Sequence, residues 1–79
     1  MTTWKDATVA ALKALGGEAD LEAIYPEAKK NYGPDHTVNA DAIIRRTIQN
    51  HASESEVYLG NEDLFQSVGG LGAGRWRLR

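Results

Sequence analysis

In the last eleven residues of the chain, a glycine-rich segment is followed by a strict alternation of charged and apolar side chains. Residues 69–74 are rich in glycine, and residues 75–79 then put Trp76 and Leu78 on one side of an extended chain, with arginines on the other. Residues 64–68, before the glycines, also favour a strand. This pattern predicts an antiparallel hairpin that packs one face on a core and turns arginines outward.

The first part of the chain has the apolar spacing of a helix. Thr3 is expected to cap it, because Thr3-Trp4-Lys5-Asp6 resembles a capping box in which Asp6 replaces glutamate. Gly16 and Gly17 are expected to end the helix, because glycine accepts the left-handed geometry of a helix end. Residues 18–19 that follow are long enough only for a short bridge at a sheet edge.

A second helix is expected after Asp20, which is placed to cap it. Pro26 lies inside this segment, where proline lacks an amide donor and clashes with the preceding turn. We therefore expect a kink or a break between Tyr25 and Pro26. Residues 33–38 contain a Gly-Pro-Asp sequence and are expected to form a loop.

The third helical segment has two different faces. Asn39 is expected to cap it, and the helix is expected to run to about His51. At about 100° per residue, the side expected to be buried carries Ala40, Ile43, Ile44, Thr47 and Ile48. The opposite side carries a stripe formed by Ala42, Arg45, Arg46 and Gln49.

The order of elements is helix, short strand, helix, helix and hairpin. This order predicts a mainly α fold with a small antiparallel β hairpin, which is the winged helix-turn-helix arrangement of three helices and a C-terminal wing. The 79 residues allow one domain, because a chain of this length holds a single small core. We expect residues 1–79 to be one domain of a longer protein.

Several function classes lack the residues that they need. The chain has no cysteine, which excludes a disulfide scaffold and a thiolate metal site. The spacing of His36 and His51 matches no common metal-ligand set, and no serine has a partner at the spacing of a nucleophile. We therefore expect a non-catalytic module without a cofactor. The apolar runs are too short to span a membrane, and we expect a cytoplasmic protein.

The charge of the chain is slightly acidic, but its arginines are concentrated in the second half. The net charge of -2 argues against a non-specific coat for nucleic acid. Arg45 and Arg46 lie on the third helix, whereas Arg75, Arg77 and Arg79 lie on the last strand, where Arg79 is expected to fray. Arginine suits bidentate contacts with phosphate and guanine. The alternatives are a solvated helix face and a charged edge strand that resists aggregation.

The third helix resembles the recognition helix of forkhead-type winged helices. Ile44-Arg45-Arg46-Thr47-Ile48 followed by His51 is similar to their core motif, in which an Ile-Arg-x-x-Leu run has the same register. This resemblance implies that Arg46 reads bases in the major groove and that Arg45 contacts phosphate or forms an internal salt bridge. Ala42 falls on a second base-reading position, where alanine offers only close approach or contact with a thymine methyl group.

The layout also resembles the HARE-type winged helix, through residues 21–25, 65–68 and 74–78. Residues 44–79 further resemble small winged-helix modules attached to bacterial restriction endonucleases, including modification-dependent ones. These resemblances imply a module that binds double-stranded DNA, including methylated DNA, for a linked nuclease domain. The third helix would enter the major groove while the wing contacts the flanking backbone. The implied contact residues are Asn39, Ala42, Arg45, Arg46, Gln49, Arg75 and Arg77.

The aromatic residues offer a further hypothesis and a second function class. Trp4 and Tyr58 are the candidates for exposed contacts with a modified base, whereas Tyr25 and Trp76 are expected in the core. As an alternative to DNA binding, HARE-type domains occur in the delta subunit of bacterial RNA polymerase, which is acidic like this chain. That resemblance implies a winged helix that binds protein.

Overall fold

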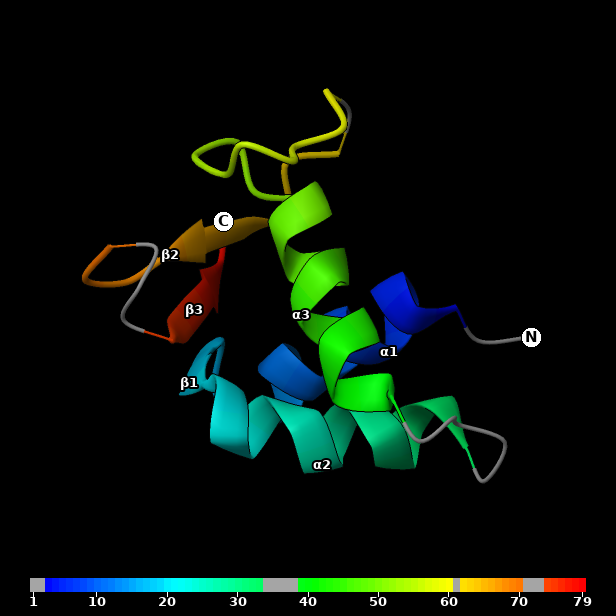
Figure 1. The fold of residues 1–79 in the computed structure, drawn as a ribbon. Coiled ribbons are helices and arrows are strands. Elements are labelled where there is room, and N and C mark those ends of the chain that lie inside the picture. The colour runs from blue at the N-terminus through cyan, green and yellow to red at the C-terminus, as the bar shows by residue number, and fades with distance from the viewer. Residues whose placement is uncertain (1–2, 34–38, 61, 71–73) are drawn as a thin grey trace.

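The protein is a mainly α fold with a small antiparallel sheet, as the sequence predicts (Figure 1). The computed structural model describes residues 3–33, 39–60, 62–70 and 74–79. Part of the predicted glycine turn and most of the predicted loop at residues 33–38 lie outside these ranges. The helices and strands are α1 (Trp4–Ala14), β1 (Glu18–Asp20), α2 (Leu21–Tyr32), α3 (Ala40–Asn50), β2 (Phe65–Ser67) and β3 (Arg75–Leu78).

Both ends of α1 follow the sequence prediction. The Thr3 Oγ1 atom accepts a hydrogen bond from the Asp6 amide at 3.1 Å, which satisfies one of the free donors of the first turn. At the other end, Gly16 and Gly17 both have a φ of 93°, a conformation that glycine adopts without steric cost. The amide of Gly17 donates to the Leu12 carbonyl at 2.7 Å. The chain therefore leaves α1 sharply and enters β1.

The predicted break in α2 is wrong. The helix runs from Leu21 to Tyr32 with Pro26 inside it. Ile24 and Ala28 lie on either side of the proline in the sequence, and neither is exposed to solvent. We attribute the continuity of the helix to this burial, because packing of an apolar face supplies more helical stability than the local preference of one residue.

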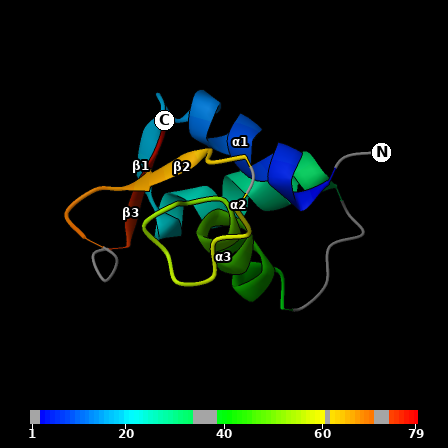
Figure 2. The ribbon, with the colours of Figure 1, turned by 90° about the horizontal axis from the view of Figure 1, so that it is seen from above.

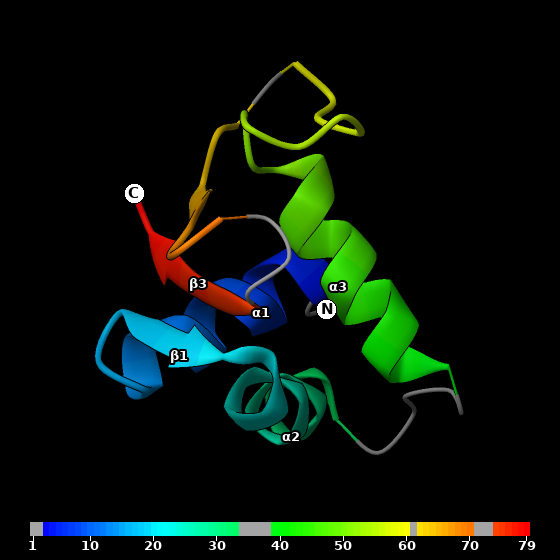
Figure 3. The same ribbon diagram turned by 60° about the vertical axis from the view of Figure 1, so that its left-hand side comes forward.

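The sheet has three strands in the order β1-β3-β2, so β1 is a full edge strand where the sequence predicts only a bridge. The predicted hairpin is confirmed, because β2 and β3 pair antiparallel. Trp76 is the centre of the sheet, since it lies opposite Ala19 on β1 and opposite Ser67 on β2. Only 2% of Trp76 is exposed. Figure 3 shows β1 and β3 side by side next to the helices.

One hydrophobic core joins the helices to the sheet. Phe65 from β2 is fully buried, and it belongs to the same cluster as Leu12 of α1, Ile24 of α2 and Ile44 of α3. The connection after α3 covers the end of that helix before the chain returns to the sheet (Figures 1 and 2). No helix within the described part of the chain is long and apolar enough to cross a membrane.

Candidate nucleic-acid interface

Helix α3 is fixed by its inner side, which leaves its outer side free of the core. Ala40, Ile44 and Ile48 are at most 1% exposed, so the predicted buried stripe is confirmed at these positions. Ile43 and Thr47 were predicted in the same stripe but are only half-buried, because they lie at its edges. His51 ends the helix as predicted, and its Nδ1 atom lies 3.2 Å from the Glu62 carbonyl oxygen. Asn39 occupies the N-cap position, but its side chain makes no capping hydrogen bond, which corrects that detail of the prediction.

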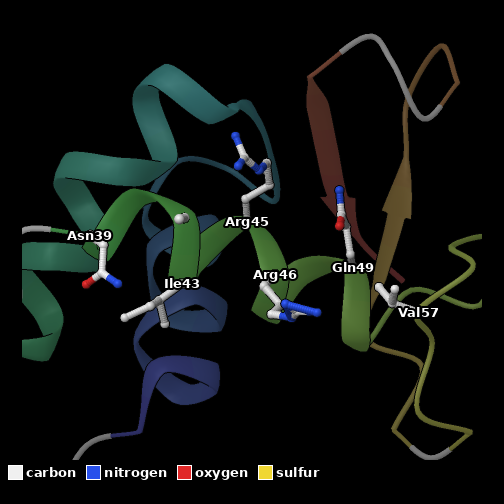
Figure 4. A pocket seen from close by; sticks show the side chains of 7 residues that line it. Asn39, Ile43, Arg45, Arg46, Gln49 and Val57 are labelled. Atoms are coloured by element: carbon white, nitrogen blue, oxygen red, sulfur yellow. The ribbon is translucent and has the colours of Figure 1, made fainter.

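The outer side of α3 carries the stripe that the sequence predicts. Ala42, Arg45 and Arg46 are exposed and Gln49 is half-buried. An open depression of about 420 Å³ brings these side chains together with Asn39, Ile43 and Val57. Figure 4 shows Arg46 near the middle of this surface, with Gln49 and Val57 toward the end of the helix. We call this surface, lined by the seven residues, the α3 face.

Val57 was not among the residues that the sequence singled out. It belongs to the connection after α3, and 40% of it is exposed. The only signal in the sequence is an apolar residue inside a polar connection. Its place beside the α3 face depends on the path of the connection, which the hydrogen bond from the Leu59 amide to the Asn50 carbonyl helps to fix at 3.0 Å.

The two arginines of the α3 face keep their charges unpaired. Within the described part of the chain, neither Arg45 nor Arg46 forms a hydrogen bond or an ion pair through its side chain. Asp41 is the acidic residue of α3, and it is paired with Lys29 of α2 at 2.6 Å. The α3 face therefore presents two cations that form no ion pair with a carboxylate among the described residues.

The arginine that begins β3 is in the opposite situation. Arg75 Nε donates to Glu18 Oε2 at 2.7 Å, and its Nη1 atom donates to Asp20 Oδ1 at 3.0 Å. These hydrogen bonds, to Glu18 first and then to Asp20, raise the pKa of Arg75 above its ordinary value. Asp20 was predicted to cap α2, but its side chain makes no capping hydrogen bond and binds Arg75 instead.

The two other arginines of this segment differ from each other. Arg77 is exposed and has no ion pair among the residues that the structure describes. Arg79 is held in place, which corrects the expectation that it frays. Its Nη2 atom donates to Glu54 Oε2 and its Nε atom donates to Asp63 Oδ1, both at 2.9 Å. The predicted row of three outward arginines thus has one free member.

The aromatic candidates are less accessible than the sequence suggests. Trp4 stacks on Tyr32 with ring centroids 3.9 Å apart and an angle of 4° between the planes, and it is half-buried. Tyr58 is also half-buried. Sequence reasoning missed Tyr32, because a stacked pair formed by two helices leaves no local pattern. Trp76 lies in the core as predicted, whereas Tyr25 is partly buried and packs against the core cluster.

Among the residues that the structure describes, no group of three histidine, aspartate or glutamate side chains is placed to hold a metal ion. Comparison of the chain with models of protein families, with curated proteins and with solved structures gives no match. The fold itself defines the class: three helices followed by a C-terminal antiparallel sheet, in a winged-helix-like topology.

Proposed function

We propose that this protein binds double-stranded DNA, with α3 in the major groove. The observation that carries the proposal is the pair Arg45 and Arg46, which are exposed on the α3 face and unpaired within the described part of the chain. The phosphates of a duplex attract such cations, and the major groove is about 12 Å wide, which admits an α-helix.

The dimensions of α3 support contact with a short sequence. The helix has 11 residues, so it is about 16 Å long at 1.5 Å per residue. Base pairs are about 3.4 Å apart along the axis, so a helix of this length spans about five of them. In this proposal Arg46, near the middle of the α3 face, donates to guanine, while Arg45 contacts phosphate.

The hairpin has a smaller part in the proposed complex. Arg77 is the arginine of β3 that can contact the flanking backbone without giving up an ion pair. Arg75 would have to exchange two carboxylate partners, Glu18 and Asp20, for a phosphate. The resemblance of the sequence to modules of restriction endonucleases supports a linked nuclease domain as the partner of this DNA-binding module.

Fluorescence anisotropy of a labelled duplex pool, at low and at physiological salt, tests the proposal. The wild-type protein is expected to bind saturably and more weakly as salt rises. The double variant R45A/R46A is expected to bind about tenfold more weakly or worse. The control is K13A, because Lys13 is also exposed and unpaired in the described part of the chain but lies on α1. Absence of binding at low salt would overturn the proposal.

A second candidate is a surface that binds protein. Val57 and Leu59 are the exposed large hydrophobic residues of the described chain, at 40% and 61%, and both lie in the connection after α3. Apolar side chains beside free arginines are also typical of protein interfaces. If no duplex binds, affinity capture with wild-type protein and a V57S/L59S control would test this candidate, which predicts a partner lost from the double variant.

A further inference from the structure

The α3 face contains apolar side chains as well as arginines. Ala42 is exposed, Ile43 is half-buried, and Val57 is 40% exposed, and all three line the same depression as Arg46. If the ligand contacted this face through phosphates alone, these apolar side chains would have no apolar partner. Their presence on the charged side of α3 indicates that an apolar group of the ligand lies against this face.

Viewed down the axis of α3, Ala42 lies between the two arginines. At about 100° per residue, Arg46 lies about 40° to one side of it and Arg45 about 60° to the other. Side chains four residues apart on a helix have Cβ atoms about 5–6 Å apart, which is between one and two base-pair steps of about 3.4 Å. Because alanine is small, it also lets the helix approach the base edges closely.

The C5-methyl group of a pyrimidine is an apolar group that the base edges present in the major groove. Guanine presents its O6 and N7 acceptors there, and an arginine can donate to both. The side chain of Ala42 therefore suits contact with the methyl group of a pyrimidine, while Arg46 suits a guanine beside that pyrimidine. The separation of Ala42 and Arg46, together with the length of the arginine side chain, allows the two features to lie on neighbouring base pairs.

Resting on the proposed function, we infer that the α3 face selects duplexes in which a pyrimidine C5-methyl group adjoins a guanine. Ala42 contacts the methyl group, and Arg46 donates to the guanine. Thymine and 5-methylcytosine both carry this methyl group. The same chemistry therefore has two sources, and an experiment can separate them.

The test begins with selection of tightly bound duplexes from a random library that contains thymine, cytosine and 5-methylcytosine. Each selected duplex is then made again with single changes that remove only the methyl group, thymine to uracil or 5-methylcytosine to cytosine. We expect one such change beside a guanine to weaken binding about fourfold, from the loss of one buried methyl group. The position of the effect identifies thymine or 5-methylcytosine as the source.

The variant A42S supplies the matched protein control, because it keeps the side chain small and replaces apolar contact by a hydroxyl group. It is expected to bind the duplexes with and without the methyl group nearly equally, whereas V57T is expected to keep the difference, because Val57 lies beside Gln49 toward the other end of the α3 face. If duplexes bind tightly but no methyl group matters, the inference is wrong and DNA binding stands. If no duplex binds, both the inference and the proposed function are wrong.

Discussion

The arginines of α3 and those of the C-terminal segment have different surroundings, although the sequence presents both as outward rows. Arg45 and Arg46 have no ion pair in the described part of the chain, whereas Arg75 and Arg79 each bind two carboxylates. Two bound carboxylates offset the positive charge of an arginine, so such an arginine attracts a phosphate less strongly. The count of basic residues therefore overstates the positive surface, and the position of the acidic residues decides where that surface lies.

The source of this difference is the sheet register. Arg75 lies opposite Asp20 across β1 and β3, so the start of the last strand is close to the acidic residues of the first. Oppositely charged side chains across a strand pair interact favourably. In the described part of the chain, no carboxylate pairs with the arginines on the outer side of α3, and Asp41, the acidic residue of this helix, is paired with Lys29. We expect mutations in the two regions to have different consequences.

The largest effect is expected from removing the packing beneath the α3 face. Ile44 is fully buried in the core, and replacement of a buried isoleucine by alanine costs about 2–5 kcal/mol. Ile44→Ala is therefore expected to lower the free energy of unfolding by that amount, measured by urea denaturation. Ala42→Ser, on the exposed side of the same helix, is the control. Equal losses in the two variants would contradict the assignment of inner and outer sides.

The next effect concerns the free arginine in the middle of the α3 face. Arg46→Ala is expected to cost about 1–3 kcal/mol of DNA-binding free energy, or about 5- to 150-fold in affinity, with little change in stability. Arg79→Ala is expected to lower the stability of the fold with little change in DNA affinity, because the guanidinium group of Arg79 binds both Glu54 and Asp63. Anisotropy titrations and thermal unfolding of both variants measure the two effects. If both variants changed DNA affinity and thermal stability in the same way, the proposed difference between α3 and the C-terminal segment would be wrong.

A smaller effect separates the two neighbouring arginines of β3. Arg77→Ala is expected to weaken binding to all sequences alike and to reduce the slope of log affinity against log salt by about 1. Arg75→Ala is expected to change that slope less, because Glu18 and Asp20 already hold Arg75. Titrations at several salt concentrations measure the slope. A larger change for Arg75 than for Arg77 would show that the ion pairs open on DNA.

The smallest effect is a loss of stability at low pH. The hydrogen bond from Lys5, together with its charge, lowers the pKa of Glu62. For Asp63, loss of water contact raises the pKa, but hydrogen bonds from Ser53 and the charge of Arg79 outweigh it and leave the pKa lowered. Groups whose pKa is lower in the folded state stabilise the fold above their unfolded pKa and lose that contribution as pH falls.

We therefore expect a modest decrease in Tm as the pH falls below about 4, where the carboxylates become protonated. The side chains of these ion pairs are partly exposed to solvent, so each pair contributes modestly. Thermal unfolding between pH 7 and pH 3 measures the decrease, and Asp63→Asn is expected to flatten part of it. A variant that keeps the full pH dependence would show that Asp63 does not contribute to it.

Much of the fold can be read from the sequence because its signals are local. Thr3 as a cap, Gly16 and Gly17 as an end, and the two faces of α3 all depend on residues within a few positions of each other. The alternation around Trp76 likewise predicts the last strand. Of the candidate site, the stripe of Ala42, Arg45, Arg46 and Gln49 is confirmed as one surface, whereas its role in DNA binding stays a prediction.

The sequence by itself determined the periodic features: three helices, a hairpin, and the arginine stripe on α3. Periods of 3.6 and 2 residues follow from backbone geometry, so they can be recognised without knowing the fold. Only the tertiary structure decided that α2 continues through Pro26, that Trp4 stacks on Tyr32, and that carboxylates hold Arg75 and Arg79. These outcomes depend on residues that are distant in the sequence but adjacent in space. The local sequence pattern does not predict such pairs.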